Sequence, residues 1–356
     1  MHTFTYDALP GRIVFGAGTA RHALSDEINA LGAQRLLLVA SESEIGLARE
    51  LCVPFADRIA AEFTGIRPHV PVEVAESARE AAAGADLVLC VGGGSTTGTA
   101  KAVALTTGLP IVAVPTTYAG SEVTSVWGMT EGTRKTTGTD RRVLPRTVVY
   151  DSDLTLTLPA ALSVASGLNA MAHCVEAFWA PRRNPVSSAV AEDGIRHLAA
   201  GLPTVAADPA DSAARAELLL GAYLAGSAFA VAGSGLHHKI CHVLGGAFDL
   251  PHAQTHAIVL PHVLAFNAAH APDAAQRIAA ALGQPDPAAA LHELGTKLGV
   301  PAGLRELGLN EDDIDTVLAD ILALAPTDNP RAVTADGLRT MVHAAWAGTD
   351  PARWTA

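Results

Sequence analysis

The chain has few aromatic and few charged residues. Phe, Trp and Tyr make up 4% of its 356 residues, and Asp, Glu, Lys and Arg make up 17%. Alanine is abundant instead, so we expect a core of closely packed aliphatic and small side chains, with an ordinary globular composition. The four cysteines are dispersed, with no CxxC pair and no disulfide-like spacing, which argues against a disulfide framework.

Signals for membranes and nucleic acids are also lacking. No apolar run reaches the roughly 18 residues of a membrane span, and the N-terminus has no basic stretch followed by an apolar one. The net charge is −12, without a dense Lys/Arg stripe, which argues against a nucleic-acid surface. We therefore expect a cytoplasmic protein that has neither nucleic acid nor a membrane as a partner.

The chain is long enough for two domains, and its texture changes near residue 153. Short apolar runs, typical of buried parallel strands, alternate with helix-length segments in the first part. The runs expected to form strands are 35–40, 85–91, 109–115 and 146–150, with weaker candidates at 13–15 and 70–74. We predict a Rossmann-like α/β nucleotide-binding domain over 1–153, with right-handed crossovers, and an all-α catalytic domain over 154–356.

A glycine-rich turn follows the second of these apolar runs. Gly92, Gly93, Gly94 and Ser95 come directly after the strand-like segment and open a helical one. Small residues let a phosphate approach the backbone, and a helix N-terminus offers free N–H donors. The spacing is neither GxGxxG nor a Walker A sequence, so a tight turn without a ligand is the alternative. We expect a pyrophosphate-binding loop.

The neighbouring strand ends carry small hydroxylated side chains as well. Thr116, Thr117 and Ser121 follow the third apolar run, at the edge where open α/β sheets bind ligands. After the first run, where dinucleotide folds often place an acid for the ribose 2′-hydroxyl, the candidates are Ser41 and Glu42. Because position 41 is not acidic, the choice between NADH and NADPH stays open.

Histidines crowd one stretch of the second half. Six of the chain's 14 histidines lie between residues 237 and 262, and histidine is the side chain best suited to bind a metal or move a proton near neutral pH. His238 and His242 are four residues apart on an expected helix, as are Asn169 and His173, so each pair shares a face. The imidazoles suit a metal site, but an amide stands where a carboxylate is expected.

The residues alone leave two readings of this cluster. It is either a metal site or a metal-free site in which protonated imidazoles bind anions and transfer protons. A purely structural role for all six histidines is the weaker alternative. Individually, His237, His262 and His270 are expected to be structural or surface residues.

The motifs taken together resemble the iron-containing (group III) alcohol dehydrogenase superfamily. GGGSTTGTAK is similar to its glycine-rich loop, PTTYAGSEVT to its second nucleotide loop, and GLNAMAHCVEAF with GLHHKICHVLGGAFDLPH to its metal-binding region. The resemblance implies the two-domain architecture of dehydroquinate synthase-like proteins, with the active site in the cleft between the domains. The superfamily's metal ligands, one Asp and three His, fall here on Asn169, His173, His238 and His252.

Three departures point to one branch of that superfamily. Asn169 replaces the Asp ligand, Gly98 replaces the Asp of GGGSxxDxAK, and His256 is an additional histidine. These features resemble the maleylacetate reductase branch, whose members reduce the carbon–carbon double bond of maleylacetate to 3-oxoadipate in the breakdown of aromatic compounds. The resemblance implies NADH or NADPH as cofactor, no metal, a small dianionic substrate and a homodimer.

The resemblance also assigns roles to single residues. The expected catalytic residues are His242 and His252 first, then His173, His238 and His256. Asn169, Tyr118 and Lys239 are expected to bind substrate. The expected cofactor-binding residues are Gly92, Gly93, Gly94, Ser95, Thr116, Thr117, Ser121, Lys135 and Ser41.

Three other functions compete with this one. The first is a metal-dependent group III alcohol dehydrogenase acting on a small alcohol or aldehyde. The second is a lyase similar to dehydroquinate synthase, and the third is a non-catalytic NAD-binding sensor. Metal content and NADH turnover separate these possibilities.

Overall fold

The computed structural model describes residues 3–9, 11–132 and 134–353. They divide into two compact units. The sheet unit comprises Ala8–Leu158 and Ala210–Leu219, and the helical unit comprises Met1–Asp7, Pro159–Pro209 and Leu220–Ala356. The inclusion of 210–219 in the sheet unit is a feature that the sequence texture did not indicate, and the boundary after residue 153 stays a prediction.

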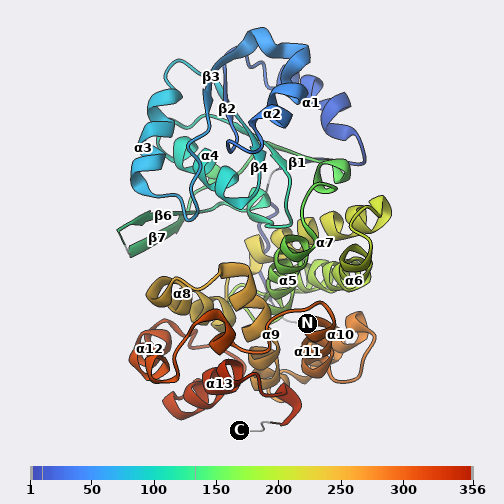
Figure 1. Cartoon of the computed structure of the whole chain (residues 1–356), viewed down its shortest axis with the longest axis vertical. Coiled ribbons are helices and arrows are strands. Elements are labelled where there is room, and N and C mark those ends of the chain that lie inside the picture. Colours follow the sequence, from blue (N-terminus) through green and yellow to red (C-terminus); the bar gives the residue numbers. More distant parts are fainter. Residues whose placement is uncertain (1–2, 10, 133, 354–356) are drawn as a thin grey trace. The chain divides into compact units, whose positions relative to one another are not determined.

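The core of the sheet unit is a six-stranded parallel sheet (Figure 1). Its strands are β1 (Arg12–Phe15), β2 (Leu36–Val39), β3 (Ile59–Phe63), β4 (Leu87–Gly92), β5 (Ile111–Pro115) and β8 (Thr147–Tyr150), in the order β1-β8-β5-β4-β2-β3. All residues of β2, β4, β5 and β8 are buried, which is why these strands read as continuous apolar runs. The α/β prediction and the five strands predicted at these positions are confirmed.

The structure differs from the sequence prediction at three places. β3 was not predicted, because its sequence IAAEF belongs to an edge strand in which half-buried and exposed residues alternate. The segment 70–74 is not a strand, since helix α3 already begins at Val72. A separate antiparallel hairpin, β6 (Val126–Glu131) with β7 (Arg134–Thr139), was also missed.

Helices cover both faces of the sheet. On one face, α1 (Thr19–Ala30) and α2 (Ile45–Cys52) pack their apolar residues against Leu36, Leu89 and Val112 in one continuous core. α3 (Val72–Ala81) and α4 (Gly94–Thr107) pack together on the opposite face (Figure 1). Short 3₁₀ helices complete the unit: η1 (Val53–Arg58), η2 (Ser121–Val123), η3 (Arg141–Val143) and η4 (Ser152–Thr155). The doubly covered sheet leaves the carboxyl ends of its strands as the ligand-binding edge.

The helical unit contains no strand in the part of the chain that the structure describes. Its helices are α5 (Ala160–Ala177), α6 (Pro185–Ala207), the second half of α7 (Ser212–Ala232), α8 (Leu236–Phe248), α9 (His252–Ala268), α10 (Pro272–Leu282), α11 (Pro287–Lys297), α12 (Glu311–Leu324) and α13 (Ala335–Ala347), with 3₁₀ helices η5 (Leu304–Leu307) and η6 (Pro351–Arg353). Asn184 caps α6 through its side chain, and Pro185 occupies the first turn, where a missing N–H costs nothing. The all-α prediction for this half is confirmed.

Helix α7 alone among the described helices is long and apolar enough to span a membrane by length and composition. Half of its apolar window is buried inside the protein. Arg215 in this helix is fully buried and donates to the Tyr118 hydroxyl at 3.1 Å and to the Leu158 carbonyl at 2.8 Å. These contacts are those of a core helix.

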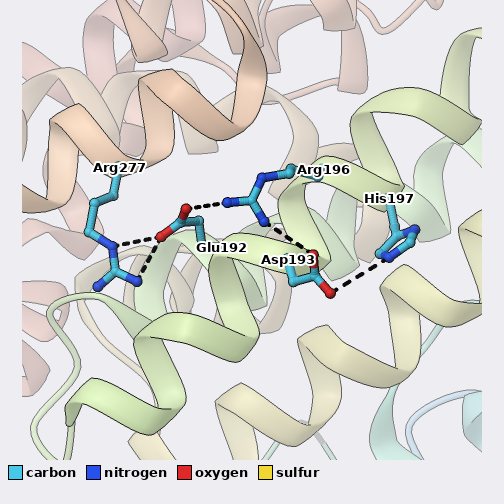
Figure 2. Close-up of polar contacts among 5 residues, drawn as sticks. All are labelled: Glu192, Asp193, Arg196, His197 and Arg277. Atoms are coloured by element: carbon cyan, nitrogen blue, oxygen red, sulfur yellow. Dashed lines mark hydrogen bonds and ion pairs between the residues drawn. The ribbon is translucent and has the colours of Figure 1, made fainter.

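An ion-pair network on α6 connects it to α10 (Figure 2). Glu192 accepts from Arg196 on its own helix and from Arg277 on α10 at 2.7 Å. Asp193 pairs with Arg196 at 3.1 Å and with His197 at 3.7 Å. Since most of these groups are solvent-accessible, the network contributes little to the free energy of unfolding.

Candidate active site

In the sheet unit, the glycine-rich turn connects β4 to α4, and its glycines carry no side chains that would cover its backbone. β4 ends at Gly92, which has φ +151°, and α4 begins at Gly94. A Cβ on Gly92 would lie 2.5 Å from the Thr96 Oγ1 atom, and one on Gly93 would lie 3.0 Å from the Thr117 Cγ2 atom. Gly92 therefore requires glycine, and a side chain at Gly93 would need Thr117 to shift. The N–H groups that open α4, Ser95 included, remain approachable by an anion.

The second loop lies against this turn. Thr116 and Thr117 follow β5, and Ser121 opens η2. The Ser121 Oγ atom is buried and has no hydrogen-bond partner among the described residues, and a Cβ on Gly94 would lie 4.0 Å from it. An unpaired hydroxyl beside a helix N-terminus is what a phosphate or ribose oxygen would satisfy.

A buried lysine fixes the conformation of the second loop. Lys101 of α4 donates from Nζ to the carbonyl oxygens of Ser121 at 2.6 Å, Thr124 at 2.8 Å and Val126 at 2.8 Å, and to the Thr124 Oγ1 atom at 2.9 Å. Burial lowers the pKa of Lys101 to about 7, an effect that the nearby Glu122 carboxylate opposes. The lysine of the GGGSxxGxAK motif therefore fixes the backbone of the loop that follows β5.

The glycine at position 98 has a packing reason. A Cβ on Gly98 would lie 2.8 Å from the Val70 Cγ2 atom. An aspartate would have no room there unless Val70 moved, because an ideal Cβ contact this short does not occur in real structures. This departure from GGGSxxDxAK thus follows from the packing of the 70–71 segment over α4.

Three further predicted residues of the sheet unit lie in different settings. Ser41 lies at the carboxyl end of β2, in line with a role at the cofactor edge. Lys135 lies on β7 of the separate hairpin with its side chain exposed. Tyr118 is fully buried, and its hydroxyl accepts from Arg215. The roles assigned to these three residues stay predictions.

The helical unit brings the predicted histidines into one cluster. His173 comes from α5, His238 and His242 from α8, and His252 and His256 from α9. Neighbouring ring centroids lie 5.1 Å apart for His173 and His238, 4.8 Å for His238 and His256, 4.4 Å for His252 and His256, and 6.2 Å for His242 and His252. The α-helical spacing of the histidines is therefore realised as a contiguous imidazole cluster.

The cluster has a buried layer and an exposed rim. His173, His238 and His256 are buried, whereas His242 and His252 are exposed. The two exposed rings lie nearly parallel, with an interplanar angle of 18°. The exposed rim can exchange protons with water. The buried layer lies in a medium of low dielectric constant, where hydrogen bonds to a ligand are stronger than in water.

Glu176 is a site residue that the sequence analysis missed. Its carboxylate is fully buried and accepts from the backbone N–H of Gly235 at 2.9 Å and of His237 at 2.7 Å, and from the His238 Nδ1 atom at 2.5 Å. This bond places the Nδ1 proton of His238 toward the carboxylate and leaves Nε2 facing away. The sequence signal was the spacing of Glu176, three residues after His173 on the same helix.

His237 belongs to the site as well, although we expected it to be structural. Its Nε2 atom lies 2.9 Å from the His256 Nδ1 atom in a buried hydrogen bond. In the tautomer in which His237 donates, His256 carries its own proton on Nε2. His237 then fixes the orientation of His256 as Glu176 fixes that of His238.

Burial makes part of the cluster electrically neutral. It lowers the pKa values of His173, His237 and His256 well below the ordinary histidine value, and the neighbouring imidazoles lower them further. These three rings are therefore uncharged at pH 7. The expectation of protonated imidazoles is wrong for them, because each is desolvated and faces other basic rings. A neutral imidazole still offers one N–H donor.

Several buried polar atoms of the cluster have no hydrogen-bond partner among the described residues. They are the Asn169 Oδ1, His173 Nδ1, His238 Nε2 and His256 Nε2 atoms. Buried polar atoms normally find partners, so four unsatisfied ones in one cluster indicate a place where a polar ligand binds. Lys239, the other residue expected to bind substrate, is half-buried on α8.

Among the described residues, the superfamily's metal positions do not form a compact group of His, Cys, Asp or Glu ligands. Within 3–9, 11–132 and 134–353, His237, Cys241 and His256 alone form a group of three or more potential ligands with all ligand atoms within 4.8 Å of one another. In that group the two histidines already bond to each other, and burial raises the pKa of the Cys241 thiol well above its ordinary value. The positions with which the superfamily binds metal form no such group and supply a neutral amide, Asn169, in place of the carboxylate.

Comparison with known proteins establishes the family. Residues 10–152 match the family described as iron-containing alcohol dehydrogenase, and residues 163–346 match the C-terminal part of the Fe-containing alcohol dehydrogenase family. The chain belongs to the iron-containing alcohol dehydrogenase family. This confirms the resemblance seen in the motifs and makes the chain an oxidoreductase.

Several relatives are similar to this chain over nearly its whole length. Maleylacetate reductase of Sphingobium indicum is 48% identical over 351 residues, 98% of this chain and 99% of the relative. The crystal structure of maleylacetate reductase from a Rhizobium species has a TM-score of 0.94 at 42% identity, covering 99% and 100% of the two chains. That of an iron-containing alcohol dehydrogenase from Corynebacterium glutamicum has a TM-score of 0.96 at 48% identity, covering 99% of each chain.

Proposed function

We propose that the protein reduces the carbon–carbon double bond of maleylacetate to 3-oxoadipate with NADH or NADPH. The observation that carries this proposal is the buried layer of neutral imidazoles with unsatisfied nitrogens, beside an amide, Asn169, where the family's metal carboxylate stands. The relatives that bear the name maleylacetate reductase at 42–48% identity support it.

The chemistry of the substrate matches such a site. Maleylacetate is a dianion whose double bond is conjugated to a ketone, so reduction at the alkene carbon β to the ketone places negative charge on the ketone oxygen. A donor aimed at that oxygen lowers the barrier. The buried His256, with Nε2 as an uncharged donor when His237 donates to it, is our assignment for this role.

The remaining proton goes to the α carbon of the enolate. His242 and His252 form the exposed rim and exchange protons with water, which suits a general acid. His173 and His238 complete the wall of the substrate site, with Asn169 offering its amide to a substrate oxygen. Lys239 and Tyr118 are the residues that we propose for the substrate carboxylates.

The nicotinamide cofactor supplies the hydride when it is bound. For its pyrophosphate we propose the backbone of Gly92, Gly93, Gly94 and Ser95, together with the unpaired hydroxyl of Ser121. Thr116, Thr117 and Ser41 line the same edge, and Lys135 is proposed as a further contact.

We propose further that the reaction needs no metal. An alcohol dehydrogenase must help to deprotonate a hydroxyl group of high pKa, which a bound dication does well. Reduction of an enone requires only that an enolate be stabilised, which neutral donors can do. The neutral amide of Asn169 supports this part of the proposal.

The test compares NADH consumption with maleylacetate and with simple aldehydes, before and after exhaustive chelation. We expect rapid, chelator-resistant turnover of maleylacetate and poor turnover of aldehydes. Good aldehyde reduction that is lost on chelation and restored by iron or zinc would instead identify a metal-dependent group III alcohol dehydrogenase. Absence of NADH turnover with either substrate would favour a non-catalytic NAD-binding protein.

The setting of the reaction completes the proposal. We propose a cytoplasmic homodimer in the breakdown of aromatic compounds, with neither nucleic acid nor membrane as a partner. Light scattering during size-exclusion chromatography measures the mass against 36.5 kDa per chain.

A further inference from the structure

One acidic residue at the cofactor edge has no part in the function described so far. Glu44 lies three residues beyond Ser41 and directly precedes α2, yet its side chain makes no capping bond to that helix. Its Oε2 atom accepts from the Ser41 hydroxyl at 2.8 Å, and its Oε1 atom accepts from the Thr116 hydroxyl at 2.6 Å. The carboxylate therefore bridges the carboxyl ends of β2 and β5.

The same carboxylate lies at the end of the strand between them. A Cβ on Gly92, the last residue of β4, would lie 2.7 Å from the Glu44 Oε2 atom. Since Gly92 begins the phosphate-binding turn, the negative charge of Glu44 lies next to the place where a dinucleotide's phosphates and ribose bind. Glu42, the acid that the sequence analysis considered, is exposed.

We infer that Glu44 selects NADH over NADPH, an inference that rests on the proposed use of a nicotinamide dinucleotide. A carboxylate in this crevice favours the ribose 2′-hydroxyl as a donor and repels a 2′-phosphate. Each Glu44 oxygen accepts one bond from the protein and has a second lone pair for a ribose hydroxyl. The segment 40–46, ASESEIG, contains no Lys or Arg that would neutralise a 2′-phosphate.

The experiment measures dissociation constants of NADH and NADPH by fluorescence titration of the full-length protein without substrate. We expect the wild type to bind NADH at least about tenfold more tightly than NADPH. Glu44→Gln removes the charge and keeps the size of the side chain, and it is expected to reduce this preference at least about fivefold, mainly by tighter NADPH binding. Glu42→Gln is the matched control and leaves the ratio unchanged within twofold.

The outcomes separate this inference from the proposed function. Equal binding of both cofactors by the wild type, or a ratio unmoved by Glu44→Gln, overturns the role of Glu44 while dinucleotide binding stands. Failure to bind either cofactor overturns both. If Glu44→Gln does not fold, the wild type still decides, because equal dissociation constants for NADH and NADPH overturn the role of Glu44.

Discussion

Two buried polar clusters, one in each unit, differ in how completely their hydrogen bonds are made. In the sheet unit, Lys101 donates to four acceptors, and Glu122 accepts from the Tyr150 hydroxyl at 2.7 Å. In the helical unit, the histidine cluster leaves the Nε2 atoms of His238 and His256 without partners. Lys101 and Glu122 are buried, as are His238 and His256, so burial alone does not distinguish scaffold from site.

The difference indicates what each cluster does. A satisfied network holds the backbone of the loop after β5 and has no capacity left for a ligand. A cluster with unsatisfied polar atoms destabilises the fold unless a ligand supplies the missing hydrogen bonds. Such destabilising features are typical of functional sites. Glu176 and His237 belong to this unsatisfied cluster. Each fixes the orientation of a neighbouring imidazole through one ring nitrogen and leaves the other ring nitrogen without a partner.

The largest expected effect comes from breaking the satisfied cluster. Lys101→Met removes a buried donor from three carbonyls and a hydroxyl, of which the Ser121 carbonyl and the Thr124 hydroxyl keep other hydrogen bonds. We expect the free energy of unfolding to fall by about 3 kcal/mol. Urea denaturation measures it. Lys297→Met is the control, because Lys297 forms only an exposed pair with Glu293, and it should change stability by less than about 0.5 kcal/mol. A similar small change for both variants would contradict the scaffold role of Lys101.

The next prediction breaks the support of the unsatisfied cluster. Glu176→Gln puts an amide where His238 needs an acceptor, and we expect kcat/KM for maleylacetate to fall by about 10- to 100-fold, mostly in kcat. Steady-state kinetics measure it, with circular dichroism as a check of folding. Glu176→Asp keeps the carboxylate and should recover part of the activity. An aspartate variant no better than the glutamine variant would point to a purely structural role.

A smaller effect is expected at the rim. His252→Ala should lower kcat/KM at least about tenfold, which corresponds to about 1.4 kcal/mol of transition-state stabilisation. His270→Ala, an exposed histidine in the turn after α9, serves as the matched control. If the two variants agree within twofold, His252 does not belong to the catalytic group.

The pH dependence of stability tests whether buried histidines are neutral. Burial lowers the pKa of His262 to about 3, against 6.5 for the free side chain. Below pH 6.5 the unfolded chain binds a proton that the folded one cannot, so stability is greatest above pH 6.5 and falls as the pH drops toward 3. His262→Leu should remove about 1.4 kcal/mol per pH unit from this slope, measured by denaturation at pH 5–7. Parallel curves for variant and wild type would show that the pKa of His262 is the same in the folded and the unfolded protein, so that burial does not lower it.

The smallest change in turnover is expected from restoring the family's carboxylate. Asn169→Asp should raise iron or zinc affinity, because a charged ligand offsets a dication, without improving maleylacetate reduction. Metal analysis after dialysis and steady-state kinetics measure the two quantities. A variant that gains maleylacetate turnover only with metal would oppose the metal-free proposal.

Much of the fold and part of the site could be predicted from local patterns. The apolar runs of β2, β4, β5 and β8 and the helical periodicity after residue 158 gave the architecture, because burial on both faces leaves a simple signature. The edge strand β3 and the hairpin β6–β7 were not predicted, since neither is buried enough to have a continuous apolar sequence. Glu44 and Glu176 escaped for another reason: single acids are common, and only their contacts distinguish these two.

The sequence by itself determined the fold class, the position of the glycine-rich turn and the set of histidines on three helices. Those features depend on residue types and on spacings of a few residues, which the chain displays directly. Only the tertiary structure decided which imidazoles are buried, which nitrogens stay unpaired and which groups the two missed acids contact. Glu176 meets His238 across 62 residues, and Glu44 meets Thr116 across 72. Contacts over such separations are set by packing of whole elements, which no local pattern encodes.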